Sequence, residues 1–346
     1  MIGIIANPSS GKDIRRLVAQ GTVFDNMEKV NILQRIMAVI HSAGLRDVYM
    51  MPDAFSMSER VRNNLKKSLK IHVPIKKLDM ICMNDQTDSV RAAKLLQQMG
   101  ATAIITLGGD GTNRAVAKSC QKVPLIPLST GTNNVFPKMI EGTMAGMAAV
   151  VVERDRDKRF VKMNRRKKLN IYKNHQLIDL ALVDAAITND RFVGARALYE
   201  VEALCELAVT TAKPDCLGMS AIAGSILPVG ETDDYGLYLK VGKGGELKTW
   251  VPMAPGMMQC VTFESYRKIE ENERFMIKTK EGMVALDGER EVPFNPEDRI
   301  DIALSLEGPY VVDINETLRH ASQGGFFIEK DGQGLTKSKA YSFYMK

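Results

Sequence analysis

The sequence predicts an α/β domain with a mostly parallel sheet, followed by a β-rich C-terminal domain. In the first half, short apolar runs alternate with segments whose apolar residues recur at helical spacing, which is typical of strands joined by helices. In the second half, short alternating runs separated by turn residues are typical of antiparallel strands. The 346 residues suit about two domains. We expect them at 1–155 and 156–314, with the tail 315–346 packing back on the first domain.

The elements of the first half follow one another in a regular order. The apolar run at 2–6 predicts a strand buried on both faces, and the stripe at 30–43 predicts a helix. Further strands are expected at 47–51, 78–83, 103–107 and 124–128, and further helices at 58–69, 89–99 and 112–120. Right-handed crossovers between such strands make the sheet mostly parallel, with helices on both faces.

The second half changes character after a basic run at 154–168, which we expect to be a solvated linker or hairpin between the domains. Strands are then expected at 177–184, 235–241, 258–265, 275–280, 283–286 and 300–305. A helix at 198–212 interrupts this pattern, and a short helix is expected at 314–321.

Composition excludes several classes of function. The net charge of +6 is modest and aromatic residues are only 6% of the chain, whereas nucleic-acid binders show a basic stripe with interleaved aromatics. The five cysteines lack the spacing of a metal or redox site. The apolar stretch at 144–152 is shorter than the ~20 residues of a membrane span. We therefore expect a soluble, cytoplasmic protein that binds no nucleic acid.

The most informative motif is the turn Gly108-Gly109-Asp110-Gly111-Thr112, which lies between an expected strand and an expected helix. Its glycines let the backbone approach a ligand closely, and the N–H groups at the helix start favour an anion. A carboxylate beside a phosphate is expected where it binds magnesium or takes a proton from an attacking hydroxyl. The alternative is a glycine turn in which the aspartate only caps the helix.

Two further polar loops follow strands of the same sheet. The first contains Asn7, Ser10, Gly11 and Lys12, and its alternative interpretation is an ordinary polar turn. The second contains Thr130, Gly131, Thr132 and Asn133. Because the carboxyl ends of parallel strands share one edge, all three loops are expected to line one crevice, where they would hold a triphosphate.

These motifs, in this order, resemble the superfamily of NAD kinases, diacylglycerol kinases and sphingosine kinases. The amino-acid sequences of the turn at 108–114 and of the loop at 129–137 are most similar to the ATP-NAD kinase/AcoX family, where AcoX stands for acetoin catabolism protein X. The resemblance covers nearly the whole chain. It implies a Rossmann-like, NAD kinase-like α/β domain and a β-rich domain with a cleft between them. It also implies ATP and Mg²⁺ as co-substrate and metal, and a homodimer or homotetramer.

The resemblance also implies roles in the second half. Asn189-Asp190 is similar to an Asn-Glu pair of NAD kinases, and Gly224-Ser225 matches part of their dinucleotide-binding stretch. These four residues are the expected acceptor-binding set. Asp287 lies in an Asp-Gly-Glu sequence like that of the lipid kinases, where the aspartate acts as base. The threonines and tyrosine of the dinucleotide-binding stretch are missing at 220–228, so the acceptor stays open.

The sequence thus predicts an ATP-dependent phosphotransferase that acts on a hydroxyl of NAD or a related nucleotide or metabolite, linked by resemblance to acetoin catabolism. Asp110 and Asp287 are the candidate catalytic carboxylates, and Asp110 is also a candidate ligand for magnesium. The first alternative is a diacylglycerol or sphingoid lipid kinase, favoured by Asp287-Gly288-Glu289. The second is a nucleotide-binding accessory protein without catalytic activity, favoured by the altered stretch at 220–228.

Overall fold

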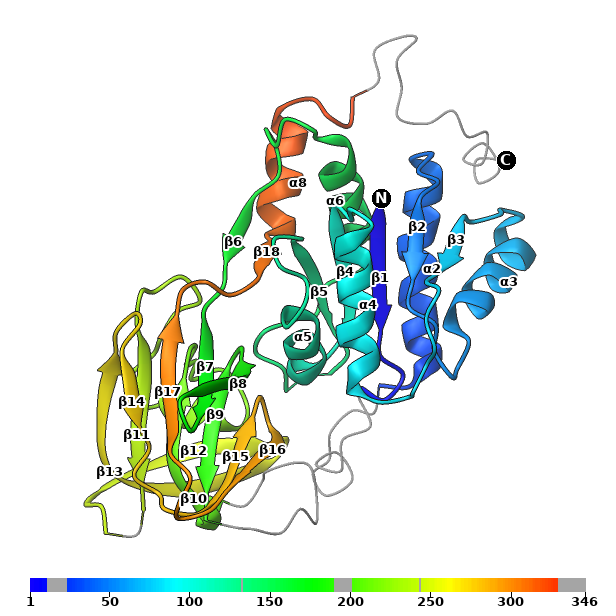
Figure 1. The fold of residues 1–346 in the computed structure, drawn as a ribbon. Helices are drawn as coiled ribbons and strands as arrows, with labels where there is room; N and C mark the ends of the chain where they lie inside the picture. The colour runs from blue at the N-terminus through cyan, green and yellow to red at the C-terminus, as the bar shows by residue number, and fades with distance from the viewer. Residues whose placement is uncertain (11–23, 132, 190–200, 243, 329–346) are drawn as a thin grey trace.

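The protein folds into two lobes, seen in a computed structural model that describes residues 1–10, 24–131, 133–189, 201–242 and 244–328. In the N-terminal lobe, helices cover both faces of a mostly parallel sheet, and the C-terminal lobe consists of antiparallel sheets (Figure 1). This arrangement confirms the predicted fold class. Among the described residues, no helix combines the length and the apolar character needed to cross a membrane.

The N-terminal sheet has seven strands in the order β3-β2-β1-β4-β5-β18-β6. Strands β1 to β5 and β18 run parallel, and only β6 is antiparallel to its neighbour. The strands are β1 (Ile2–Ala6), β2 (Val48–Met50), β3 (Ile75–Lys77), β4 (Ala103–Gly108), β5 (Leu125–Ser129), β6 (Met163–Arg165) and β18 (Tyr310–Val312).

Helices cover this sheet because its strands are apolar on both faces. Ile4 belongs to a buried cluster with α2, α3 and α6, whereas the adjacent Ile5 belongs to a cluster with α4 and α5. The helices are α2 (Asn26–Ser42), α3 (Met57–Leu69), α4 (Gln86–Gln98), α5 (Asp110–Ala117), α6 (Gly142–Arg154) and α8 (Ile314–Gln323). Helix α8 lies beside α6 (Figure 1), and Leu318 packs on their shared core.

The C-terminal lobe is built from two antiparallel sheets. The larger sheet has the order β12-β13-β11-β10-β9-β15-β16, and the smaller one has the order β14-β17-β7-β8. The strands are β7 (Lys168–Lys173), β8 (Gln176–Ala181), β9 (Asp184–Thr188), β10 (Leu204–Val209), β11 (Gly236–Val241), β12 (Leu247–Ala254), β13 (Met257–Ile269), β14 (Arg274–Met276), β15 (Gly282–Leu286), β16 (Glu289–Phe294) and β17 (Ile300–Ser305). A short helix, α7 (Met219–Gly224), covers the outer face of the larger sheet.

The chain leaves the N-terminal lobe after β6 and returns to it at β18. The first sheet therefore contains the strand that precedes the C-terminal lobe in the sequence and the strand that follows it. The expected domain limits at 155 and 314 fall a few residues before β6 and a few residues after β18 respectively. Two polypeptide crossings therefore connect the lobes, one at 166–167 and one at 306–309.

Two elements differ from the sequence prediction. The described part of the expected helix at 198–212 is a 3-10 turn at Val201–Ala203 followed by strand β10. This prediction was wrong because both faces of β10 are covered: Leu207 packs in one core cluster and Ala208 in another. A strand buried on both faces loses the alternation that would distinguish it from a helix. The strand expected at 78–83 is likewise replaced by β3, just before it.

The basic run at 154–168 is not a solvated linker throughout. Its first residue, Arg154, ends α6, and Lys168 begins β7. Between them, Arg166 and Lys167 are buried at the junction of the two lobes. The prediction was wrong for these two side chains because the lobes close over them, which a sequence pattern does not reveal.

Candidate functional site

Three loops meet at the carboxyl edge of the N-terminal sheet. Strands β1, β4 and β5 are parallel neighbours, so the loops that follow them leave the sheet on the same side. The Asn7 amide donates a hydrogen bond of 3.0 Å to the Thr112 hydroxyl. The hydroxyls of Ser10 and Thr130 lie 3.1 Å apart. The first loop thus contacts the other two, and it does so through polar side chains.

The first loop is held by a buried ammonium group. Lys29 of α2 is fully buried, and its Nζ donates to the carbonyl oxygens of Asn7 at 2.8 Å and Ser10 at 2.6 Å. A third bond of 3.0 Å reaches the Asn26 side chain. A buried charge is tolerated when hydrogen bonds satisfy it, so Lys29 fixes the loop backbone. The predicted ligands Gly11 and Lys12 lie outside the described residues.

The Gly108–Thr112 turn needs glycine because other site residues approach its backbone. A Cβ on Gly109 would lie 2.7 Å from the Asn134 amide oxygen, and one on Gly111 would lie 2.7 Å from a Glu289 carboxylate oxygen. A Cβ on Gly108 would lie 2.5 Å from the Thr112 side chain. None of these glycines has positive φ. The close approach that the sequence predicts is therefore to protein side chains as well as to any ligand.

Asp110 joins the second loop to the third. Its carboxylate accepts hydrogen bonds from the backbone N–H of Val135 at 3.1 Å and of Phe136 at 2.8 Å. The turn itself is braced by Asn113, whose amide donates to the Gly109 carbonyl at 2.9 Å. Asp110 is thus half-buried at the start of α5 and fixes the segment that follows β5.

The third loop folds around the end of β5. The backbone N–H of Thr130 donates to the Gly108 carbonyl at 3.4 Å, and the Gly131 carbonyl accepts from the Ser129 hydroxyl at 2.5 Å. Asn133 also belongs to this loop, whereas Thr132 lies outside the described residues. The loop therefore sits directly beside the Gly108–Thr112 turn.

Asp287, the second candidate catalytic carboxylate, lies in the C-terminal lobe in the turn between β15 and β16. Its side chain is fully buried, and it accepts hydrogen bonds from the backbone N–H of Leu182, Val183 and Asp184 at 2.8–3.2 Å. Burial raises the pKa of Asp287, and the nearby Arg114 and the three N–H donors act in the opposite direction. In this conformation the carboxylate holds the corner between β8 and β9.

Arg114 connects the two lobes. This α5 residue lies two positions after the glycine-rich turn, and its guanidinium is fully buried. It pairs with Asp179 at 3.1 Å, Asp287 at 3.8 Å and Glu289 at 3.5 Å, all in the C-terminal lobe. Glu289 also accepts a hydrogen bond of 3.2 Å from Gln86 of α4. The turn therefore packs against C-terminal residues on one side.

The expected acceptor-binding residues lie in the C-terminal lobe. Asn189 is exposed at the end of β9, and Asp190 lies outside the described residues. Gly224 is buried, and a Cβ there would lie 2.3 Å from the Lys213 backbone. Ser225 is exposed and accepts a bond of 2.9 Å from Thr249. Within the described part of the chain, no hydrogen bond joins Asn189 or Ser225 to the three loops.

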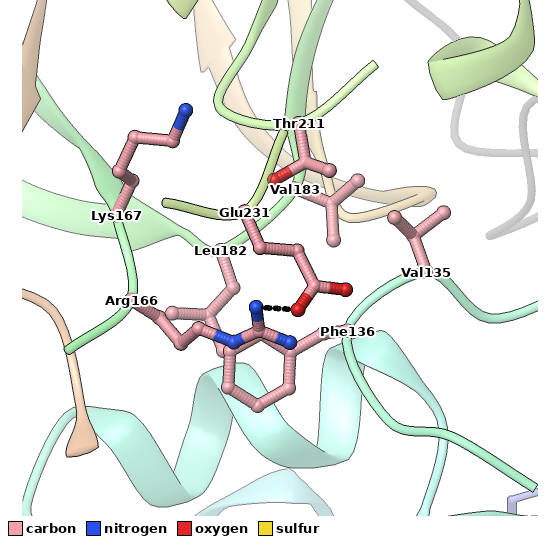
Figure 2. A pocket seen from close by; sticks show the side chains of 8 residues that line it. All are labelled: Val135, Phe136, Arg166, Lys167, Leu182, Val183, Thr211 and Glu231. Atoms are coloured by element: carbon pink, nitrogen blue, oxygen red, sulfur yellow. Dashed lines mark hydrogen bonds and ion pairs between the residues drawn. The ribbon is translucent and has the colours of Figure 1, made fainter. Parts of the chain in front are cut away.

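A pocket opens between the lobes beside Phe136. Its cavity volume is only about 10 Å³, because the lining side chains nearly fill it. The lining residues are Val135, Phe136, Arg166, Lys167, Leu182, Val183, Thr211 and Glu231. Figure 2 shows the Arg166 guanidinium over the Phe136 ring, paired with Glu231, while the Lys167 side chain extends away from that pair. Because Asp110 binds the Phe136 N–H, this pocket adjoins the three loops.

Burial affects both basic residues of the pocket. It lowers the pKa of Arg166 to about 10 and that of Lys167 to about 8. The Lys167 Nζ donates to the carbonyls of Gly230 at 2.9 Å and Tyr235 at 2.7 Å, whereas no described residue is a hydrogen-bond partner of the Arg166 Nε. The Arg166 guanidinium stays charged at neutral pH.

A magnesium ion would have few protein ligands here. The described residues contain no group of three or more His, Cys, Asp or Glu side chains arranged to hold a metal. Magnesium is commonly held by one or two carboxylates together with substrate phosphates and water. Asp110 supplies one carboxylate at the meeting point of the loops, which fits that donor set.

Sequence reasoning missed Lys29, Arg114 and Glu231. Lys29 carried a usable signal, because it lies next to the apolar stripe of α2, one turn before Leu33. Arg114 lies two positions after the glycine-rich motif, which was also a signal. Glu231 had none, since a glutamate in a loop is ordinarily solvated.

Both halves of the chain are similar to known protein families. Residues 2–156 match the family model of the ATP-NAD kinase N-terminal domain, and residues 167–307 match that of the acetoin catabolism protein X C-terminal domain. Acetoin catabolism protein X of Cupriavidus necator is 36% identical over 332 residues, which cover 93% of this chain and 92% of that protein. The chain belongs to the acetoin catabolism protein X family. Its N-terminal domain is thus of the NAD kinase type.

Solved structures with a similar arrangement are more distant. Yeast NADH kinase complexed with NADH is 14% identical, with 96% of this chain and 89% of that chain covered and a TM-score of 0.49. A putative diacylglycerol kinase from Bacillus anthracis is 13% identical, with 90% and 96% covered and a TM-score of 0.45. The family membership rests on the sequence relative.

Proposed function

We propose that this protein is an ATP-dependent phosphotransferase, which transfers the terminal phosphate to a hydroxyl of a small metabolite of the NAD class or related to it. The observation that carries the proposal is the contact of three strand-end loops through Asn7, Thr112, Ser10 and Thr130, with Asp110 between them. The name of the Cupriavidus necator relative supports a link between this proposed activity and acetoin catabolism. ATP and Mg²⁺ are the co-substrate and metal of this proposal.

The residues suit the chemistry of phosphate transfer. Such transfer depends mainly on positioning and on neutralising charge, so it needs hydroxyl and backbone donors, a metal and one carboxylate. Asp110 would take the proton from the acceptor hydroxyl as that oxygen bonds to the terminal phosphorus and the bond to ADP breaks. Asp110 and Asp287 both accept backbone hydrogen bonds, but Asp287 is fully buried whereas Asp110 is only half-buried and lies where the loops meet. We therefore assign the catalytic role to Asp110.

The test replaces the carboxylate with its amide. Asp110→Asn keeps an oxygen that can accept from the Phe136 N–H, so we expect the fold and ATP affinity to change little. We expect the transfer rate to fall about 10²- to 10⁴-fold, the usual contribution of a general base. Transfer from labelled ATP would be measured against NAD, NADH, diacylglycerol and a broad set of hydroxylated metabolites. Asp79→Asn, at an exposed position, is the matched control, and undiminished turnover of Asp110→Asn would exclude this role.

A second candidate function is nucleotide binding without transfer. Backbone N–H groups donate hydrogen bonds to both Asp110 and Asp287. These bonds give each carboxylate a structural role that does not require catalysis, which favours this second function. Calorimetric binding of ATP, together with no labelled product for any acceptor in the same screen, would support an accessory role and contradict the kinase proposal.

A further inference from the structure

Three cations converge on one carboxylate at the mouth of the interlobe pocket. Arg166 forms an ion pair with Glu231, the Lys213 Nζ lies 2.6 Å from Glu231, and the Lys138 Nζ lies 3.6 Å from it. Lys138 comes from the segment after β5, whereas Lys213 and Glu231 come from the C-terminal lobe. Two elements from different lobes therefore direct positive charge at the same point.

The charges in this cluster do not balance. Three cations share one carboxylate, which leaves two positive charges in excess. Asp313 also acts electrostatically on Arg166 and Lys138, but its carboxylate caps α8 by accepting from the Glu316 N–H at 3.0 Å. Asp215 likewise acts electrostatically on Lys213, so the imbalance is confined to the Glu231 carboxylate, which three cations contact directly. Three cations around one carboxylate make the local potential positive, and such a site attracts anions.

The cluster also has unused binding capacity. Arg166 is buried, with 7% of its side chain exposed, yet its Nε has no hydrogen-bond partner among the described residues. The guanidinium presents several donors in one plane, which suits the oxygens of phosphate or carboxylate. Lys213 and Lys138 are 30% and 59% exposed, so a ligand entering from solvent can reach them.

The position of the cluster relative to Asp110 indicates which substrate it serves. Asp110 binds the backbone of Phe136 on the side of the three loops, and the Phe136 side chain lines the pocket under Arg166 (Figure 2). The segment 134–138 therefore separates the proposed triphosphate loops from the cations. An acceptor held at the cations would therefore lie against the segment whose backbone Asp110 binds from the other side.

We propose that Lys138, Arg166 and Lys213 bind an anionic group, a phosphate or carboxylate, of the phosphate acceptor, and that Glu231 occupies this place when the acceptor is absent. This inference rests on the proposed function and narrows its acceptor to an anionic metabolite. Glu231 would compete with the bound anion for the same three cations. Removing the charge of Glu231 and removing a lysine should therefore have opposite effects on anion binding.

The experiment measures binding of inorganic phosphate by calorimetry, without turnover. Removing one charged donor typically costs about tenfold in affinity, so we expect Lys213→Gln and Lys138→Gln to weaken phosphate binding about fivefold to tenfold. Glu231→Gln should strengthen it by a similar factor. Lys122→Gln, at an exposed position away from the pocket, should leave it unchanged. MgATP affinity should stay within twofold in all four variants.

Several results would overturn the inference. Phosphate binding that is absent from both the wild type and Glu231→Gln would exclude an anion site. Weaker binding in Glu231→Gln would show that the cluster is only a structural ion network. Loss of MgATP affinity in parallel with phosphate, together with competition between the two, would assign the cations to the donor. Failure of MgATP to bind, with phosphate behaving as expected, would instead contradict the kinase proposal and leave the anion site intact.

Discussion

Buried cations are handled in three ways in this molecule. Lys29 is satisfied by carbonyl and amide oxygens, Arg114 by three carboxylates, and Lys167 by two carbonyl oxygens. In each case the charge fixes a backbone segment that a strand or helix alone would not hold. Burying a charge is costly unless it is paired or hydrogen-bonded, so these residues act as anchors rather than as general sources of stability.

Lys167 gives a prediction for the dependence of stability on pH. Burial lowers its pKa to about 8 in the folded protein, from 10.5. Between these values the unfolded chain binds more protons, so this group makes the protein more stable as pH rises from about 8 to about 10.5. At 1.36 kcal/mol per unit, the free energy of unfolding should rise by up to roughly 3 kcal/mol.

The measurement is urea unfolding at pH 7.5 and pH 10, compared between the wild type and Lys167→Met. The variant should lack this rise, so the stability difference between the two proteins should change by roughly 2–3 kcal/mol over the range. The comparison cancels other groups that titrate in alkali. An unchanged difference would mean that Lys167 keeps an ordinary pKa in the fold.

Among the elements, the position of the short helix α7 depends on close packing against a neighbouring backbone segment. Helix α7 lies against the segment at 212–214 through Gly224, whose missing Cβ leaves room for the Lys213 backbone. The same segment carries the Lys213 side chain to Glu231. The position of α7 therefore affects one wall of the interlobe pocket, although no α7 side chain lines that pocket.

Gly224→Ala tests this packing. A Cβ 2.3 Å from the Lys213 carbonyl carbon forces α7 or the segment to move, and overpacking of this kind costs about 1–3 kcal/mol. The free energy of unfolding, measured by urea denaturation, should fall by that amount. Ser225→Ala, one residue further at an exposed position, should change it by less than about 0.5 kcal/mol. Equal effects of the two substitutions would contradict the packing argument.

Across the whole molecule, the lobes are joined by two chain crossings and by the ion network around Arg114. Asp287 is fully buried beside this guanidinium, and Asp179 and Glu289 complete the network. Arg114 follows the glycine-rich turn by two residues, so the network holds the turn in a fixed relation to the C-terminal lobe. Any acceptor bound by that lobe would gain a fixed position relative to Asp110.

Arg114→Met should separate this role from ordinary surface pairing. Removing one partner of a buried pair costs about 3–5 kcal/mol, because the carboxylate of Asp287 is left without its cation. The control is Lys118→Met, which removes a partly exposed partner of the same Asp179 and should cost about 1 kcal/mol or less. Adding Asp287→Asn to Arg114→Met should restore part of the loss. A loss in urea unfolding no larger than that of the control would contradict the bridging role.

The sequence by itself determined the fold class and the family. The alternation of strands and helices in the first half is a local pattern, and the motifs at 7–11, 108–112 and 129–134 follow strands whose parallel order can be read from that alternation. Local patterns were sufficient because each strand end and each loop is contiguous in the chain. They failed at β10, where burial on both faces removed the alternation.

Only the tertiary structure decided what the charged residues do. The hydrogen bonds of Asp287 to the N–H groups of 182–184 could not be predicted from its sequence motif, and Arg166 was expected to be solvated but lies buried between the lobes. Glu231 and Lys213 meet Arg166 from positions far apart in the sequence. The function of a charged side chain depends on burial and on the charges around it, and both are set by long-range packing that no contiguous stretch of sequence encodes.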